Sequence, residues 1–297
     1  MKRKRQPKIL VNIPVELKSI IKQPISIPPN TSILDARDIL IRHRIGRLII
    51  KFNNKPVGIV TEKDISKSVS VFSGKPIAKI YVRDIMSKDL ITIQPEESIY
   101  DCAKLMKKHD ISSVIVKNPR GKLVGVVTKT DLVSTFLIQS TASLPISKIM
   151  TKNLITVSPN DSIFEVESIL LNNKISRVIV SKNKIPVGII THRDFVPAKT
   201  FDLHKEFTDP AERSEIFWNS QLNEFNVNKL SYLLTFSAKD IMTKDPFVVS
   251  SNDVVYTAAI MMIRHGISGL PVIRDKKLVG IITKSDIVNI IASKGRI

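Results

Sequence analysis

One short segment of this chain occurs four times. It reads Gly-Ile-Val-Thr-Glu-Lys-Asp at 58–64 and returns at 125–131, 188–194 and 280–286, with glycine, threonine and aspartate at matching places. The four glycines lie 67, 63 and 92 residues apart. Self-similarity over such intervals is typical of an architecture built from several copies of one supersecondary unit. We therefore expect four similar units.

The segments around each copy predict the same order of elements. A short strand, 90–93 in the second repeat, precedes a helix on which Ile99, Cys102, Ala103 and Met106 fall at helical spacing. A β-branched strand, a turn and a third strand follow. The threonine then begins a second helix. The sequence thus predicts an α/β (α+β) fold of four β-α-β-β-α repeats.

Domain boundaries follow from this pattern. We expect a basic N-terminal tail at 1–19, repeats at 20–72, 79–138, 144–199 and 236–295, and an insertion at 200–235. Seven of the 16 aromatic residues lie between positions 200 and 236, beside several acidic residues. This insertion either packs over the neighbouring repeats or contacts a partner, and Trp218 is the residue best suited to a contact.

Composition argues against several classes of protein. The single cysteine, Cys102, rules out an intrachain disulfide, and its place on an apolar helix stripe predicts a core thiol. No Cys/His cluster has the spacing of a metal site, and no Ser/His/Asp or Cys/His constellation indicates an enzyme. No apolar run approaches a membrane span, and no apolar signal core follows the N-terminus. We expect a cytoplasmic protein that is not an enzyme.

The repeated Thr-x-x-Asp has two interpretations. A threonine at a helix start, with an acid three residues later, is close to a capping box. The same place also suits a nucleotide, because a helix N-terminus offers free N–H groups and a positive dipole to phosphate. A carboxylate one turn into the helix can bind both hydroxyls of a ribose. Capping alone leaves unexplained why all four copies use threonine and aspartate.

The repeated blocks resemble a known family. The segments RDIMSKDLITI at 83–93, ISSVIV at 111–116 and GIITKSD at 280–286 are similar to the CBS domain, named for cystathionine β-synthase. The resemblance covers roughly residues 20–293 apart from the insertion. It implies that the repeats pair into two Bateman modules, a layout similar to the γ subunit of AMP-activated protein kinase. It further implies clefts for a regulatory AMP, ADP, ATP or S-adenosylmethionine, with no obligatory cofactor.

Carried over to this chain, the resemblance implies composite clefts. One repeat supplies a threonine and the aspartate for the ribose: Thr61 and Asp64, Thr128 and Asp131, Thr191 and Asp194, Thr283 and Asp286. Its pair-mate supplies the adenine slot: Met86, Ile91 and Ile111 for Asp64; Ile20, Ile25 and the chain near Ile45 for Asp131; Met242, Phe247 and Ile267 for Asp194; Met150, Ile155 and Ile175 for Asp286. The alternative is that these apolar residues are simply core.

The resemblance also implies a basic residue facing phosphate at the start of the second long strand. Arg47 and Arg177 occupy that place in repeats one and three, where repeats two and four have Ser113 and Gly269. The residue before the aspartate alternates in the same way: Lys63 and Arg193 against Thr130 and Ser285. We expect two cation-rich phosphate ends, Arg47 with Lys63 and Arg177 with Arg193, and two hydroxyl-lined ones. Solvated helix charges are the alternative for Lys63 and Arg193.

The net charge of +19 is unusually high and unevenly distributed. Residues 1–140 hold 26 Lys and Arg against 12 Asp and Glu, whereas the remainder holds 20 against 15. The candidate polyanion-binding residues are Lys2, Arg3, Lys4, Arg5, Lys8, Arg37, Arg42 and Arg44. With little aromatic interleaving, they favour backbone contacts with RNA, most simply on the ribosome, over base reading.

The functional hypothesis combines these features. We expect an adenine-nucleotide-sensing regulatory protein whose basic N-terminal half docks on RNA or a ribonucleoprotein. The alternative is a nucleotide-sensing regulatory subunit of a protein partner with no RNA role. A homodimer is possible in either case.

Overall fold

The structure is a computed structural model that describes residues 16–53, 55–71, 79–139, 144–195 and 236–293. The first repeat contains η1 (Leu17–Ile20), β1 (Ser26–Ile27), α1 (Ile33–Arg42), β2 (Arg47–Phe52), β3 (Lys55–Thr61) and α2 (Glu62–Val71). The second contains α3 (Val82–Ile85), β4 (Thr92–Ile93), α4 (Ile99–Lys108), β5 (Ser113–Lys117), β6 (Leu123–Thr128) and α5 (Lys129–Gln139).

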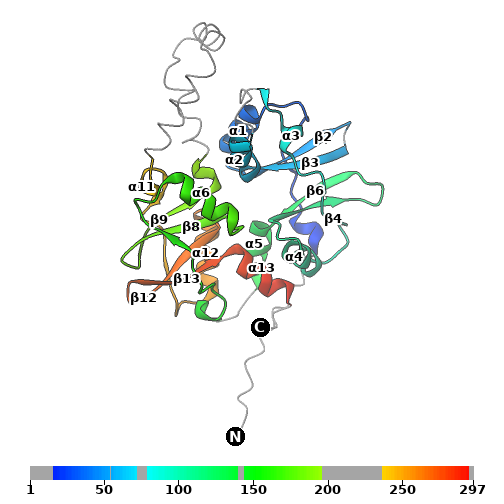
Figure 1. The fold of residues 1–297 in the computed structure, drawn as a ribbon. Coiled ribbons are helices and arrows are strands. Elements are labelled where there is room, and N and C mark those ends of the chain that lie inside the picture. The colour runs from blue at the N-terminus through cyan, green and yellow to red at the C-terminus, as the bar shows by residue number, and fades with distance from the viewer. Residues whose placement is uncertain (1–15, 54, 72–78, 140–143, 196–235, 294–297) are drawn as a thin grey trace, which may run out of the picture.

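The other two repeats follow the same order (Figure 1). The third contains η3 (Ile146–Lys148), β7 (Thr156–Val157), α6 (Ile163–Asn172), β8 (Arg177–Lys182) and β9 (Ile185–Thr191), then helical residues up to 195. The fourth contains α11 (Ala238–Ile241), β10 (Thr243–Lys244), β11 (Val249–Ser250), α12 (Val255–Arg264), β12 (Gly269–Arg274), β13 (Lys277–Thr283) and α13 (Lys284–Ala292). The predicted mixed fold is confirmed, although the first strands are shorter than expected.

Each repeat forms a small sheet of three strands, and the sheet of repeat three takes β10 of repeat four as a fourth strand. The first strand pairs in parallel with the second, and the second pairs antiparallel with the third, as in β4-β5-β6. The parallel pair is joined by the first helix, and the antiparallel pair by a tight hairpin. The predicted helical stripe is confirmed, because Ile99, Cys102, Ala103 and Met106 are all buried on α4. Burial also raises the pKa of the Cys102 thiol to about 12, so this cysteine is a core residue.

Repeats pair through the segment that precedes the first strand of each repeat, here called its lead-in. Ser87, just before the second repeat's sheet, bridges to Ile59 in β3, and Lys22 bridges to Val126 in β6. The same reciprocal backbone bridges occur between repeats three and four, at Thr151 with Ile281 and at Thr243 with Ile189. Repeats one and two therefore form one module, and repeats three and four form the other.

The contact between each lead-in and the third strand of the partner repeat explains the repeated glycine. The side chains of Met86, Met242 and Met150 lie directly over Gly58, Gly188 and Gly280, and a Cβ at Gly280 would stand 2.6 Å from the Met150 sulfur. Over Gly125, the equivalent place is taken by Ile21 and the Lys22 backbone. A side chain on any of these glycines would force the lead-in away, so the sequence keeps glycine where the two repeats touch.

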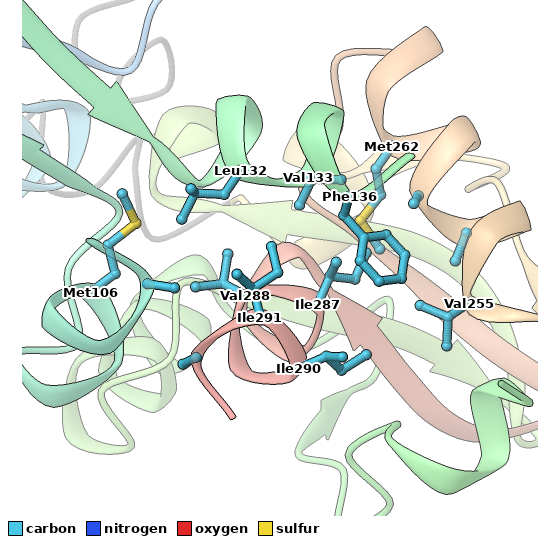
Figure 2. Close-up of a cluster of buried hydrophobic side chains, with 14 of the residues drawn as sticks. Met106, Leu132, Val133, Phe136, Val255, Met262, Ile287, Val288, Ile290 and Ile291 are labelled. Atoms are coloured by element: carbon cyan, nitrogen blue, oxygen red, sulfur yellow. The ribbon is translucent and has the colours of Figure 1, made fainter. Parts of the chain in front are cut away.

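The two modules share one hydrophobic core. Helices α4 and α5 of repeat two pack against α12 and α13 of repeat four, and their buried side chains belong to a single cluster. Figure 2 shows ten of these residues: Met106, Leu132, Val133, Phe136, Val255, Met262, Ile287, Val288, Ile290 and Ile291. Repeats one and three keep separate, smaller cores. Apolar burial between α4, α5, α12 and α13 therefore fixes the placement of one module relative to the other.

Candidate nucleotide clefts

All four Thr-x-x-Asp segments form the same helix cap. In each copy the threonine backbone N–H and hydroxyl both donate to Oδ2 of the aspartate, at 2.7–2.9 Å and 2.6–2.9 Å respectively. This is a capping box that satisfies free groups at the helix start. The local interpretation of the motif is thus confirmed in every repeat.

The structure also gives a local reason for threonine. Each of these threonines is the last residue of a strand, where a β-branched side chain is favoured, as well as the cap of the next helix. Caps elsewhere use serine with the same aspartate spacing, at Ser98 with Asp101 and at Ser237 with Asp240. Threonine is therefore explained without a ligand, and the case for a ligand rests on the aspartates.

Three of the four aspartates keep an oxygen available. Among the described residues, none bonds to Oδ1 of Asp64, Asp194 or Asp286, and all three side chains are half-buried. Burial raises the pKa of Asp194 and of Asp286, so each is a desolvated carboxyl with acceptor capacity left over. Such a group suits the paired hydroxyls of a ribose.

The fourth aspartate is already occupied. The Lys22 ammonium forms an ion pair with Oδ1 of Asp131, whose side chain is only 3% exposed. Lys22 reaches it from the lead-in of repeat one, which bridges to β6. The Lys22 side chain itself is 69% exposed, so it is anchored only at its tip. Asp131 therefore differs from the other three aspartates, because a lysine of its own module occupies its second oxygen.

The residues predicted to form adenine slots differ in how deeply they are buried. Met86, Met150 and Met242 cover the repeated glycines, and Ile20, Ile25, Ile45, Ile91, Ile111, Ile175 and Ile267 are partly buried against the cores. Ile155 and Phe247 differ, being 39% and 49% exposed. Phe247 stacks on His265 with ring centroids 4.0 Å apart. The isoleucines thus pack against the cores, whereas Ile155 and Phe247 present exposed apolar surface, and the adenine slots stay a prediction.

The two candidate phosphate arginines begin β2 and β8, where they lie across the strand pair from Thr61 and Thr191 of their own repeats. Burial lowers the pKa of Arg47, and the charges of Asp131 and Glu62 act the other way. Burial also lowers the pKa of Arg177 to about 10, against the charge of Asp286. The Nη1 atom of Arg177 would lie 2.6 Å from a Cβ on Gly269, so glycine leaves room for this arginine in repeat four. The grouping of Arg177 with the Asp194 cleft stays a prediction.

Residues before the aspartate make contacts between the modules. Arg193 Nε donates to Glu62 Oε1 at 2.8 Å, whereas Lys63 is exposed. Lys129 Nζ donates to Ser285 Oγ at 2.8 Å, and Lys284 Nζ donates to Thr130 Oγ1 at 3.0 Å. The expected hydroxyl-lined ends at Thr130 and Ser285 are thus filled by lysines of the other module.

Sequence reasoning missed Lys22, Glu62, Lys129 and Lys284. Three of them, Glu62, Lys129 and Lys284, directly follow the repeated threonine, so the motif itself contained a signal. Lys22 left no signal in the sequence, because its partner Asp131 lies 109 positions away. The two residues meet only because the lead-in of repeat one pairs with β6. The relative placement of the modules decides which of these charges meet.

Comparison with protein families explains the repeats. The family model of the CBS domain matches residues 17–71, 82–137, 146–199 and 238–293, which together make up most of the chain. The chain belongs to the CBS-domain family. Its four repeats are four CBS domains, and the two pairs are Bateman modules.

Two relatives that match nearly the whole of this chain occur in Methanocaldococcus jannaschii. The uncharacterized protein MJ1404 is 25% identical over 293 residues, covering 96% of this chain, which spans 63% of that relative's length. The uncharacterized protein MJ1225 is 23% identical over 287 residues, covering 91% of this chain and 96% of the relative. The MJ1225 crystal structure, described as a candidate archaeal homologue of γ-AMPK, has a TM-score of 0.78 at 21% identity and covers 93% of this chain and 99% of that one. This likeness establishes the fold.

The candidate RNA-binding residues are only partly described. Lys2, Arg3, Lys4, Arg5 and Lys8 lie outside the described residues, as does the insertion with Trp218. Arg42 and Arg44 are exposed at the end of the first CBS helix. Arg37 is mostly covered, and its Nη1 lies 3.5 Å from Oδ1 of Asp38. RNA or ribosome docking stays a prediction.

Two kinds of site receive no support from the CBS repeats. In the described residues, no group of three or more His, Cys, Asp or Glu side chains is placed to hold a metal ion. No helix in the same part of the chain is long and apolar enough to cross a membrane.

The burial of Lys284 predicts how the stability of the protein depends on pH. It is 7% exposed, and burial, together with Arg177 and Arg47, lowers its pKa from 10.5 to about 8, while Asp131 acts the other way. Between these pKa values the unfolded chain binds more protons than the folded one, so stability rises with pH. The ligand-free protein should gain up to about 3 kcal/mol from pH 7 to 10 relative to Lys284→Met. Urea unfolding of both proteins at each pH measures this, and equal pH profiles would contradict it.

Proposed function

We propose that this protein is a regulatory sensor of adenine nucleotides, which bind in the clefts of its two Bateman modules. The observation that carries the proposal is the free Oδ1 of Asp64, Asp194 and Asp286, each at a helix start and half-buried. A ribose hydroxyl pair can donate to that oxygen while Oδ2 keeps the helix capped. The resemblance of the motifs to the CBS domain supports adenosine as the nucleoside.

The charges near the clefts favour a phosphorylated ligand. Arg47 and Arg177 lie across the strand pair from Thr61 and Thr191, and buried atoms of both guanidinium groups lack a hydrogen-bond partner in the described residues. Bonds from cationic donors to phosphate are stronger than bonds between neutral groups. AMP, ADP and ATP should therefore bind more tightly than adenosine, and S-adenosylmethionine, which is cationic at sulfur, should bind less well.

A bound nucleotide can change how the modules contact each other. The helix starts that form the clefts are the same segments that carry Glu62, Arg193, Lys129 and Lys284 across the module boundary. A phosphate entering a cleft competes for these cations, so occupancy alters the inter-module bonds. The changed surface is the regulatory output, read by a protein partner or, through the basic N-terminal half, by RNA.

Calorimetric titration tests the proposal. Adenosine, AMP, ADP, ATP and S-adenosylmethionine are titrated into the full chain, with GTP as the control for the base. Because a charge-assisted hydrogen bond contributes about 1.5–3 kcal/mol, ADP or ATP should bind at least about tenfold more tightly than adenosine. The absence of heat for all five adenosine compounds at millimolar concentration would exclude the proposed function.

The four proposed clefts should differ in their ability to bind nucleotide. With Lys22 on Asp131, we expect at most the other three clefts to bind nucleotide in the wild type. Lys22→Ala removes this internal competitor and should raise the number of ADP molecules bound per chain. Lys18→Ala is the matched control, because Lys18 is an exposed lysine on the preceding η1. Unchanged stoichiometry in Lys22→Ala would show that Lys22 does not block the cleft.

A further inference from the structure

The first helix of repeat one presents a face that its counterpart in repeat two buries. Helix α4 packs against α13 of the other module, and Ala103 at its fifth position is fully buried in the shared core. The fifth position of α1 holds Arg37 instead. Leu34 and Ile41 lie three residues before and four residues after Arg37, so these three side chains share one side of the helix, here called the α1 face. Leu34 is half-buried and Ile41 is 51% exposed.

The α1 face has no counterpart of the α13 contact. Among the described elements, α1 packs chiefly against α2 and β2 of its own repeat, and the core of repeat one includes no described side chain of repeats three or four. Arg37 Nε and Ser66 Oγ on α2 are buried without a hydrogen-bond partner in the described residues. The equivalents of Ser66 are Val133 and Val288 of the shared core. Buried polar atoms without partners call for an explanation, and a missing binding partner is one.

The end of repeat three lies beside this face. The helix that begins after Thr191 is the counterpart of α13, which begins after Thr283, and α13 is the helix that packs against α4. Arg193 in the first turn of the repeat-three helix donates through Nε to Oε1 of Glu62 at 2.8 Å. Glu62 begins α2, so this bond places the end of repeat three against repeat one.

Repeat three lacks the apolar residues that α13 contributes to the shared core. Positions 197–199 read Pro-Ala-Lys where α13 has Asn289, Ile290 and Ile291, and both isoleucines are buried. The insertion follows directly, and the CBS family model leaves it unmatched between 199 and 238. It supplies aromatic side chains: Phe201, Phe207, Phe217, Trp218, Phe225 and Tyr232. The insertion is therefore the nearest source of apolar side chains for the α1 face.

The ends and the charge of the insertion also favour this contact. Phe195 is fully buried in the core of repeat three and Phe236 packs against the same cluster, so both ends are anchored there. Residues 200–235 hold six Asp and Glu against three Lys and Arg, in a chain of net charge +19. Arg37, Arg42 and Arg44 lie on α1 or just after it, although Asp38 offsets part of the charge of Arg37. Opposite charges at two surfaces favour their association.

We propose that the α1 face is the docking surface for the chain's own acidic, aromatic insertion at 200–235. A carboxylate of the insertion binds the Arg37 guanidinium, and aromatic side chains of the insertion cover Leu34 and Ile41. The docked segment brings carboxylates close to Arg42 and Arg44, so it competes with a polyanion for the end of α1. The contact does not require a nucleotide and so goes beyond the proposed function.

Energy transfer from tryptophan tests the proposal in the full chain. Trp218 is the only tryptophan of the protein and lies in the insertion, so it is a single donor. The only cysteine, Cys102, is buried with its pKa raised to about 12, so it does not compete for a thiol-reactive acceptor dye. His43→Cys places the dye at the end of α1. His109→Cys is the matched control, because His109 is also exposed and ends the equivalent helix α4.

We expect stronger energy transfer from Trp218 to the dye at position 43 than to the dye at position 109. Adding Arg37→Glu to His43→Cys should shift the docking equilibrium at least about tenfold toward the undocked state, because a charge-assisted bond is replaced by repulsion. Arg120→Glu, which changes an exposed arginine in the β5–β6 hairpin, should leave the transfer as it was. Should Arg37→Glu fail to fold, Ile41→Asp at an exposed position replaces it and must lower the transfer.

Equal transfer to the two dye positions overturns the proposal, as does transfer that neither Arg37→Glu nor Ile41→Asp lowers. Transfer that disappears on dilution also overturns it, because the insertion would then dock on a second copy of the chain. None of these measurements contains a nucleotide, so their outcome is independent of whether the clefts bind one.

Discussion

Phe136→Ala should destabilise the protein by about 3–5 kcal/mol, the usual loss when a fully buried phenylalanine leaves a cavity. Phe136 is 1% exposed on α5 and belongs to the cluster that α5 forms with α12 and α13 (Figure 2). Because this cluster joins the two modules, the substitution weakens their contact as well as the core of repeat two. Urea denaturation followed by circular dichroism measures the change.

Phe52→Ala is the matched control for this substitution. Phe52 is 59% exposed at the β2–β3 hairpin, so its truncation should change stability by no more than about 0.5 kcal/mol. A loss below about 1 kcal/mol for Phe136→Ala would mean that the inter-module core can collapse around the missing ring. The shared core would then be less important to the fold than its burial indicates.

Replacing the aspartates Asp64, Asp194 and Asp286 should weaken nucleotide binding by about one to two orders of magnitude. In Asp64→Asn/Asp194→Asn/Asp286→Asn each side chain keeps an oxygen for the cap but loses the charge that strengthens its bonds to ribose hydroxyls. With about 1.5–3 kcal/mol lost at each site, ADP affinity should fall roughly 10- to 100-fold. Calorimetry measures the affinity, and thermal unfolding checks that the caps survive.

The chain contains a matched control for that triple variant. Asp35, Asp101 and Asp240 accept from a serine hydroxyl three residues earlier in the same cap geometry, but outside the Thr-x-x-Asp segments. Asp35→Asn/Asp101→Asn/Asp240→Asn removes three carboxylates from helix starts and should leave ADP binding unchanged. Equal loss in the two triple variants would mean that capping, and not ribose contact, is what the cleft aspartates provide.

Local features of the molecule were predictable from the sequence. Capping by Thr61 and Asp64, the buried stripe around Cys102 and the hairpin order depend on residues a few positions apart, so spacing alone encodes them. The four copies of the segment then predicted four structural repeats. The glycines were predictable as close-packing positions, although not which side chain covers them.

Features that depend on two distant segments were not predictable. Arg177 lies against Gly269 of repeat four, a contact that grouping by repeat did not reveal. Lys22 forms its ion pair with Asp131 only because the lead-in of repeat one bridges to β6. The lysine bonds to Ser285 and Thr130 require the packing of α5 on α13, which no single repeat encodes.

A crystal structure of the full chain with ADP tests the central claim most directly. The account predicts ADP with its ribose hydroxyls on Oδ1 of Asp64, Asp194 or Asp286, its adenine beside the methionine that covers the repeated glycine, and its phosphates directed toward Arg47 or Arg177. It also predicts no ADP at Asp131 while Lys22 is present. Clefts that stay empty at saturating ADP, or ADP bound away from all three aspartates, would contradict it.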